Sequence, residues 1–249
     1  MTINDLKSKQ AVYHNARFSP LGDVGDIAQF RRNLFHDYFK AIPFKVLERL
    51  LLDLEIDLNG KRLLVASCGS GIDIYYLTQF CEPIITVSDI SENAVKQTVA
   101  TFPDMKVEGR VEDTERLSFP DGFFDYAFTA SSLHHLPRPF LGLYELLRVS
   151  KNGIFIIEPN DSWLTRLFTR LGIATEIEKS GNYVYRISKA DVEKVASSLF
   201  LSCKIKRVFA THRVATNGLE FTLLRVVHSI LNSILSQIGN CIVFYVGKT

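Results

Sequence analysis

Short apolar runs alternate with segments of helical spacing through the middle of the chain. Residues 62–67 form an apolar run that ends in a glycine turn, and residues 72–80 after it have helical spacing. Residues 84–88 and 91–99 repeat this order of strand and helix. Strands that alternate with helices are typical of right-handed crossovers and a mostly parallel sheet covered on both faces. The pattern predicts a doubly wound α/β fold.

Further segments extend this pattern in both directions. Helices are expected over residues 43–54 and around 140–149, and strands just before residue 112, at 124–129 and at 153–157. The first forty residues are mixed and rich in aromatics, with Pro20, Gly22 and Gly25 marking a turn.

The C-terminal part predicts an antiparallel edge. Ser188 and Asp191 form a variant capping box that begins a helix ending near Leu199. Strand candidates follow at residues 204–210 and 242–246, and the long apolar segment 219–238 lies between them. We expect these two late strands to pair.

The segment 219–238 is close to the length of a membrane span, but it is not expected to cross one. Polar residues such as Glu220, Arg225 and Asn232 interrupt it, and its apolar positions share one face of a helix. An amphipathic helix fits better. Three roles stay open for it: packing on the core, pairing two copies in a homodimer, and contact with a membrane surface.

Composition bounds the class of protein. The 249 residues, 47% of them hydrophobic and 22% charged, are enough for one elaborated domain with its own core. The formal charge of +2 disfavours a protein devoted to nucleic acid. Residues 160–249 hold 12 basic and 6 acidic side chains, which we interpret as a solvated cationic surface.

The cysteines and the N-terminus suggest a reducing compartment. Cys68, Cys81, Cys203 and Cys241 lie far apart without a CxxC pair, so neither a zinc site nor a disulfide framework is expected. No metal site is predicted. The first residues lack the apolar core of a signal peptide, and a cytoplasmic protein is expected.

Candidate chemistry lies in the turns after the predicted strands. Gly69 and Gly71 allow close approach of the backbone to a ligand, and the helix that follows favours a carboxylate or phosphate. Asp89 ends the second strand, where an acid can bind both hydroxyls of a ribose. Its alternative role is a helix N-cap. Asp113 follows the third strand. It could accept a hydrogen bond from an exocyclic amine of a purine, or it could simply be an acidic residue of a turn.

Five motifs in this order resemble class I S-adenosylmethionine-dependent methyltransferases, in particular their small-molecule branch. The resemblance covers about residues 43–160 and implies a seven-stranded sheet whose last strand is antiparallel. The motifs are Cys68-Gly-Ser-Gly71, Val87-Ser-Asp89-Ile-Ser, Asp113 with Leu117-Ser-Phe-Pro-Asp-Gly-Phe-Phe-Asp125, Ser131-Ser-Leu-His-His-Leu136 and Glu145-Leu-Leu-Arg-Val-Ser-Lys-Asn-Gly153.

The resemblance implies roles for residues at matching positions. It implies S-adenosylmethionine as the cofactor, with Ser131 beside the sulfonium and His134 and His135 near the acceptor. The remaining cofactor contacts that it implies are Ser67, Cys68, Gly69, Ser70 and Gly71 at the methionine end, Asp89 and Ile90 at the ribose, and Asp113 and Thr114 at the adenine.

Two positions in the first motif depart from the family. Val65 stands where the family usually has an acid, and Ser67 stands where it usually has its first glycine. Loss of the acid removes an anchor for the methionine moiety. We therefore expect either a low affinity for the cofactor or another group that supplies the contact.

Methyl transfer to a small molecule needs orientation more than it needs a catalytic residue. Holding the nucleophile in line with the methyl group lowers the activation barrier by roughly 7–11 kcal/mol in well-oriented systems. A phenolic acceptor would benefit from a base, for which His134 and His135 are the candidates, although capping or packing suits each of them as well. An amine or carboxylate would need none.

We expect segments outside the cofactor core to select a small, hydrophobic or aromatic acceptor. Residues 1–42 are interpreted as a cap, and residues 43–249 as the methyltransferase domain, with an insert at about 160–187 and the amphipathic helix at about 218–239. Packing remains the alternative for every candidate aromatic. These are Tyr13, Phe18, Phe30, Phe35, Trp163, Phe168, Tyr183 and Tyr185.

Three other classes of protein were weighed against this one. Ile74 occupies the third glycine position of a dinucleotide-binding fingerprint, which disfavours a dehydrogenase. A non-catalytic scaffold that binds the cofactor fits the departures at Val65 and Ser67. A membrane-associated methyltransferase with a lipid-like acceptor fits the apolar segment 219–238.

Overall fold

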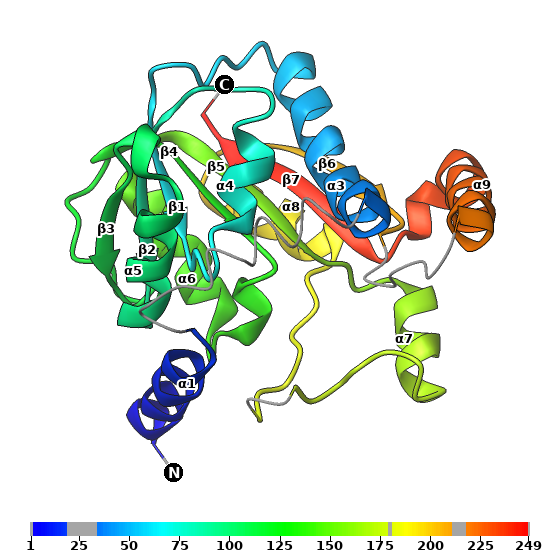
Figure 1. The fold of residues 1–249 in the computed structure, drawn as a ribbon, viewed down its shortest axis with the longest axis horizontal. Coiled ribbons are helices and arrows are strands. Elements are labelled where there is room, and N and C mark those ends of the chain that lie inside the picture. The colour runs from blue at the N-terminus through cyan, green and yellow to red at the C-terminus, as the bar shows by residue number, and fades with distance from the viewer. Residues whose placement is uncertain (1, 19–33, 179–180, 211–217, 249) are drawn as a thin grey trace.

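Seven strands form a single mixed sheet in the computed structural model, which describes residues 2–18, 34–178, 181–210 and 218–248 (Figure 1). Their order is β3-β2-β1-β4-β5-β7-β6, and β7 alone runs antiparallel to its neighbours. This confirms the predicted doubly wound sheet. The strands are β1 (Arg62–Ala66), β2 (Ile84–Asp89), β3 (Glu108–Val111), β4 (Phe124–Ala130), β5 (Ser150–Pro159), β6 (Ser202–Val208) and β7 (Cys241–Gly247).

Helices cover both faces of the sheet. The α-helices are α1 (Ile3–Arg17), α3 (Leu34–Asp53), α4 (Ile72–Leu77), α5 (Glu92–Thr101), α6 (Pro139–Val149), α7 (Trp163–Arg170), α8 (Lys189–Ser198) and α9 (Gly218–Leu235). Short 3₁₀ turns are η1 (Pro103–Met105), η2 (Leu133–His135) and η3 (Ser236–Ile238). Residues of α3 and α4 belong to the core on one face, and residues of α6 and α8 belong to the core on the other.

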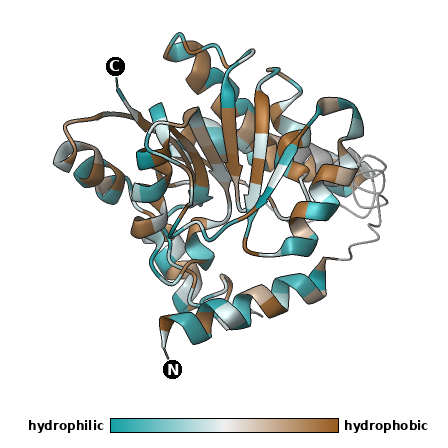
Figure 2. Ribbon diagram, turned by 90° about the vertical axis from the view of Figure 1, so that its left-hand side faces the viewer, coloured by the Kyte–Doolittle hydropathy of each residue, from teal (hydrophilic) through white to brown (hydrophobic). Residues whose placement is uncertain are grey.

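The apolar runs of the sequence form strands buried on both faces. In β1, Leu63 and Val65 join one core cluster while Leu64 and Ala66 join the other. Figure 2 shows the hydrophobic residues concentrated in the central strands, with both kinds of residue on the helices. Burial on both sides explains why these strands appear as continuous apolar runs rather than as alternating patterns.

Local signals in the C-terminal part are confirmed. Ser188 accepts a hydrogen bond from the Asp191 N–H, and the Asp191 side chain accepts one from the Ser188 N–H, so a complete capping box begins α8. β6 and β7 pair antiparallel, as expected, with Cys203 opposite Val246. The predicted turn at residues 20–25 and Phe30 lie outside the described residues.

The apolar face of α9 is exposed. The helix forms as predicted, but Leu219, Leu223, Ile230 and Ile234 face solvent, and His228 is its buried residue. The alternative of a core-packing helix is therefore wrong, because periodicity identifies a shared face and not what covers it. The helical stretch Gly218–Ile238 is long and apolar enough to cross a membrane by length and composition alone, and 6% of its most apolar part is buried.

Candidate functional site

A cavity of about 1020 Å³ opens where β1, β2, β4 and β5 end. The turns after these strands form its floor, and α1, α3 and the segment after α7 form its walls. In α/β sheets of this kind, ligands bind at the carboxyl ends of the strands. Of the predicted cofactor contacts, those that line the cavity are Ser67, Cys68, Gly69, Ser70, Asp89, Ile90 and Ser131.

The turn between β1 and α4 has a left-handed backbone that explains its glycines. Gly71 has φ 79°, and a Cβ there would lie 3.0 Å from side-chain atoms of Thr98 and Phe102. Gly71 itself lies outside the lining of the cavity. Ser67, at the position where the family has glycine, has φ 53°, and its hydroxyl lies 3.1 Å from that of Thr114. A left-handed residue other than glycine costs roughly 1–2 kcal/mol.

Asp89 ties the end of β2 to the glycine turn. Its carboxylate accepts hydrogen bonds from the Gly69 N–H at 3.0 Å and from the Ser91 N–H at 2.9 Å. Burial raises the pKa of Asp89, and these backbone donors oppose the rise. Ser91, rather than Asp89, caps α5. The carboxylate lines the cavity and keeps lone pairs for further donors.

Asp113 and Thr114 lie outside the lining of the cavity. Asp113 accepts a hydrogen bond from the Glu115 N–H at 2.9 Å and forms an ion pair with Lys7 of α1. Thr114 is buried, and its hydroxyl contacts Ser67. The N-terminal helix thus occupies the neighbourhood in which the resemblance implies the adenine.

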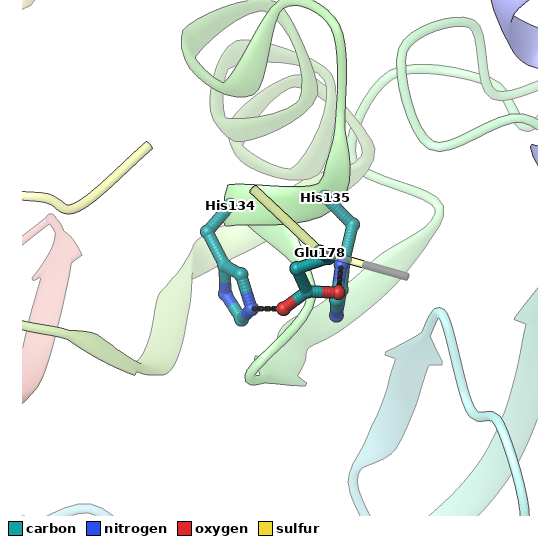
Figure 3. Close-up of side chains that lie close together, drawn as sticks. All are labelled: His134, His135 and Glu178. Atoms are coloured by element: carbon teal, nitrogen blue, oxygen red, sulfur yellow. Dashed lines mark ion pairs between the residues drawn. The ribbon is translucent and has the colours of Figure 1, made fainter. Parts of the chain in front are cut away.

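Two histidines and two glutamates line another part of the cavity, called the histidine end below. Figure 3 shows three of them, His134, His135 and Glu178. The buried Glu158, at the end of β5, accepts hydrogen bonds at 2.7 Å from the N–H groups of Ser132 and Leu133. Its second oxygen lies 2.6 Å from His134 Nδ1. Glu158 thereby orients the ring, and His134 Nε2 points to Glu178 at 3.5 Å.

Glu178 also lies 2.9 Å from His135 Nδ1. Burial of His134 favours the neutral ring, but Glu158 and Glu178 outweigh it and raise the pKa of His134 to about 9. His134 and His135 in turn hold the pKa of Glu178 well below its usual range. At neutral pH, His134 is therefore an imidazolium held between two carboxylates.

The same three side chains could hold a metal ion. His134, His135 and Glu178 offer ligand atoms within 4.8 Å of one another. Cysteine and histidine spacing did not indicate this group, because Glu178 comes from a distant segment. A proton on His134 already balances the charge of the cluster, so no chemistry is assigned to a metal here.

The structure separates the predicted acceptor aromatics. Phe18 and Phe168 line the cavity. Trp163 is exposed, and Tyr183 and Tyr185 line a second cavity of about 650 Å³ beside Arg166 and Arg186. Tyr13 is half-buried outside both cavities, and the side chain of Phe35 lies outside the described residues.

Several residues that line the cavity were not singled out in the sequence. Asp73 follows the glycine turn by two positions, a local signal that could have identified it. Lys40, Glu158 and Glu178 carry no such signal, because only the fold brings their segments together.

Comparisons with known proteins give a consistent picture. The profile of a methyltransferase domain matches residues 64–157. The chain is 34% identical over 99 residues to 2-methyl-6-phytyl-1,4-hydroquinone methyltransferase of Synechocystis, and 30% identical over 98 residues to 27-O-demethylrifamycin SV methyltransferase of Amycolatopsis mediterranei. These segments cover 39% and 38% of this chain, but only 31% and 36% of those proteins.

Solved structures share the fold across most of the chain. Magnesium protoporphyrin IX methyltransferase of Synechocystis, solved with bound S-adenosylhomocysteine, superimposes with a TM-score of 0.58 at 14% identity and covers 86% of each chain. An S-adenosylmethionine-dependent methyltransferase of Thermotoga maritima gives a TM-score of 0.57 at 15% identity over 91% of this chain and 98% of its own. At these identities the likeness concerns the fold alone.

Proposed function

We propose that this chain, in which residues 64–157 belong to the class I S-adenosylmethionine-dependent methyltransferases, transfers a methyl group to an oxygen or nitrogen of a small apolar molecule. One observation carries the proposal. A single cavity is lined both by the glycine turn with Asp89 and by His134 with His135. A cofactor and an acceptor bound there would share one space, as a direct transfer requires.

The residues at the first end fit the nucleoside of S-adenosylmethionine. Asp89 is fixed by the Gly69 and Ser91 N–H groups and offers its remaining lone pairs to the ribose hydroxyls. Gly69 has a left-handed backbone and no side chain of its own, and the Phe18 Cζ atom lies 3.6 Å from the place that a Cβ would take. When bound, the cofactor supplies a methyl group already activated by its sulfonium. The protein then has to orient the acceptor and exclude water.

The rest of the cavity suits an apolar acceptor. Phe18, Phe44, Phe168 and Ile173 contribute to its lining, together with the histidine end. Two of the relatives are named for 2-methyl-6-phytyl-1,4-hydroquinone, a hydroquinone with a phytyl chain, and for 27-O-demethylrifamycin SV, named as lacking a methyl group on an oxygen. We infer an acceptor of this kind, a hydroxylated aromatic or lipid-like molecule.

His134 is the group best placed to accept a proton from such a hydroxyl. Glu158 binds Nδ1, so the Nε2 atom faces the cavity. Glu178 now lies against Nε2, where an acceptor hydroxyl would have to bind. We infer that the acceptor displaces Glu178, one of the two carboxylates that raise the pKa of His134, and that Nε2 releases its proton to solvent at this point. The neutral Nε2 then takes the hydroxyl proton, and Glu158 stabilises the imidazolium that forms again. An acceptor that is already ionised would not need this step.

The test is transfer of a radiolabelled methyl group from S-adenosylmethionine to a panel of acceptors. Hydroquinones with and without a prenyl tail, phenols and aromatic amines separate the classes. We expect turnover on hydroxylated apolar acceptors and little on free amino acids. Tight cofactor binding without turnover on any acceptor would instead support a non-catalytic scaffold.

The exposed face of α9 favours a second candidate, in which the acceptor is a lipid taken from a membrane surface. Leu223, Val226, Ile230 and Ile234 form an unpartnered apolar stripe, with Arg225 on the same helix. Amphipathic helices can lie in the membrane interface with their apolar face buried among the lipids. Co-sedimentation with anionic vesicles, lost in a Leu223→Ser/Ile230→Ser variant, would support it. Unchanged sedimentation would leave only the soluble acceptor.

A further inference from the structure

The methionine end of the cofactor site lacks its usual acid. Val65, at the position of that acid, is fully buried in the core packed against α3 and α4. S-adenosylmethionine ends in an α-ammonium and an α-carboxylate. Charged groups taken out of water need opposite charges or hydrogen bonds. Another part of this chain must therefore receive the ammonium.

Asp73 is a carboxylate with no hydrogen bond or ion pair to any other residue that the structure describes. It lies in the first turn of α4, two residues after Gly71, and lines the cavity together with Gly69 and Ser70. Burial raises the pKa of Asp73 to about 7, and no hydrogen bond from a described residue opposes the rise. A cation bound beside Asp73 would keep it ionised and remove this penalty.

Glu158 is the other buried acid on the cavity, but its oxygens are already used. It accepts from the N–H groups of Ser132 and Leu133 and from His134. Asp89 is likewise held by two backbone donors at the ribose end. Glu178, half-buried like Asp73, is paired with both histidines. Among the described acids that line the cavity, Asp73 is therefore the one left with both oxygens available.

A matching cation faces the same space. Lys40 of α3 lines the cavity, and its burial lowers the pKa of its amine, an effect that Asp73 opposes. No ion pair within 4.0 Å joins Lys40 to Asp73 in the described residues, so both charges remain open to a ligand. Arg17 of α1 adds a second positive charge at this end.

We propose that Asp73 binds the α-ammonium and Lys40 the α-carboxylate of the methionine end of S-adenosylmethionine. The inference rests on the proposed function. It assigns to α4 and α3 the contact that the family makes from the end of β1. One half-buried acid and one half-buried base, which line one cavity and form no ion pair with each other among the described residues, are complementary to a zwitterion.

Two ligands distinguish binding of the amino acid end from binding of the nucleoside. S-adenosylhomocysteine carries the amino acid end, whereas 5′-methylthioadenosine has the same nucleoside and neither charge. Calorimetry would give the dissociation constants of both ligands for the wild type, Asp73→Asn, Lys40→Met and Asp89→Ala. Asp104→Asn, which makes the same change at an exposed acid outside the cavity, is the matched control.

We expect Asp73→Asn to weaken the binding of S-adenosylhomocysteine about 10- to 100-fold, the usual range for a hydrogen bond to a charged group. The binding of methylthioadenosine should weaken less than about twofold. Lys40→Met should show the same selectivity. Asp89→Ala should weaken both ligands alike. An equal loss of both ligands in Asp73→Asn, or no loss, would overturn the proposal. If the wild type bound neither ligand, the proposed function itself would fail.

Discussion

The two ends of the cavity are built in different ways. At the end proposed for the nucleoside, Gly69 follows β1 and Asp89 is the last residue of the neighbouring parallel strand β2, and backbone N–H groups hold the acid. At the histidine end, His134 depends on Glu158 from β5 and on Glu178 from the segment after α7. The position of Asp89 and Gly69 follows from the sheet topology. The histidine end depends on contacts between side chains from distant segments. We therefore expect the nucleoside end to tolerate little change, and the histidine end to respond to pH and to the acceptor.

The largest expected effect tests the nucleoside end. Asp89→Ala removes the carboxylate proposed to bind the ribose and leaves the Gly69 and Ser91 N–H groups without their partner. We expect S-adenosylhomocysteine binding to weaken by at least about 100-fold, since a ligand-facing carboxylate and the order of the turn are lost together. Calorimetric titration measures this. An unchanged dissociation constant would rule out the ribose assignment.

The next effect concerns the buried acid of the histidine end. Glu158→Gln keeps the shape but removes the charge that faces His134. Breaking one partner of a buried pair costs about 3–5 kcal/mol, and the amide must also face two backbone donors. We expect the free energy of unfolding to fall by about this amount in urea titrations. The exposed pair of Lys189 with Glu193 offers a control, because Glu193→Gln should change it by less than about 1 kcal/mol.

The pH dependence of stability sharpens the comparison further. His134 has its pKa raised from 6.5 to about 9 in the folded protein, so the folded state binds this proton more tightly than the unfolded chain. The stabilisation is complete below pH 6.5 and is lost as the pH rises through about 9. We expect the unfolding free energy of the wild type to decline over this window and that of His134→Gln to decline less. Parallel curves would contradict the charged cluster.

Turnover distinguishes the two histidines. Glu158 orients His134, while His135 contacts only Glu178 among the described carboxylates. With a phenolic acceptor, His134→Ala should reduce kcat by about 100-fold and His135→Ala by far less. With an acceptor that is already ionised, both variants should turn over normally. Intact turnover of both variants on the phenol would reject the base.

The smallest effect lies at the glycine turn. Ser67 holds a left-handed backbone at φ 53°, which glycine adopts without strain. Ser67→Gly should relieve roughly 1–2 kcal/mol of backbone strain and lose a hydrogen bond to Thr114 worth about 1 kcal/mol. We therefore expect a rise in unfolding free energy of at most about 1 kcal/mol. A clear loss of stability would mean that the contact with Thr114 outweighs the strain.

What the sequence could predict follows the same division. The alternation of strands and helices, the helix begun by Ser188 and the position of Asp89 at the end of β2 were predictable, because each depends on a pattern within a few residues. The seven strands and the antiparallel last strand followed from the family resemblance instead. The contact of Glu178 with His134 was not, since more than forty residues and a change of direction separate them. The motif order suggested Asp113 for the adenine, but its ion pair with Lys7 depends on where α1 docks.

The exposure of α9 is a second feature that the sequence could not predict. Its apolar positions were correctly assigned to one face of a helix, yet they face solvent. Hydrophobic periodicity shows which residues share a face of the helix, but it does not show what that face contacts. The vesicle experiment with the Leu223→Ser/Ile230→Ser variant addresses that partner directly.

Titration of the purified wild type, shown to be folded and free of bound nucleoside, with S-adenosylhomocysteine is the most direct measurement. If the cavity at the ends of β1 and β2 is the cofactor site, one molecule should bind per chain with micromolar affinity, despite Val65. Absence of heat at millimolar ligand would contradict a functional cofactor site in this chain.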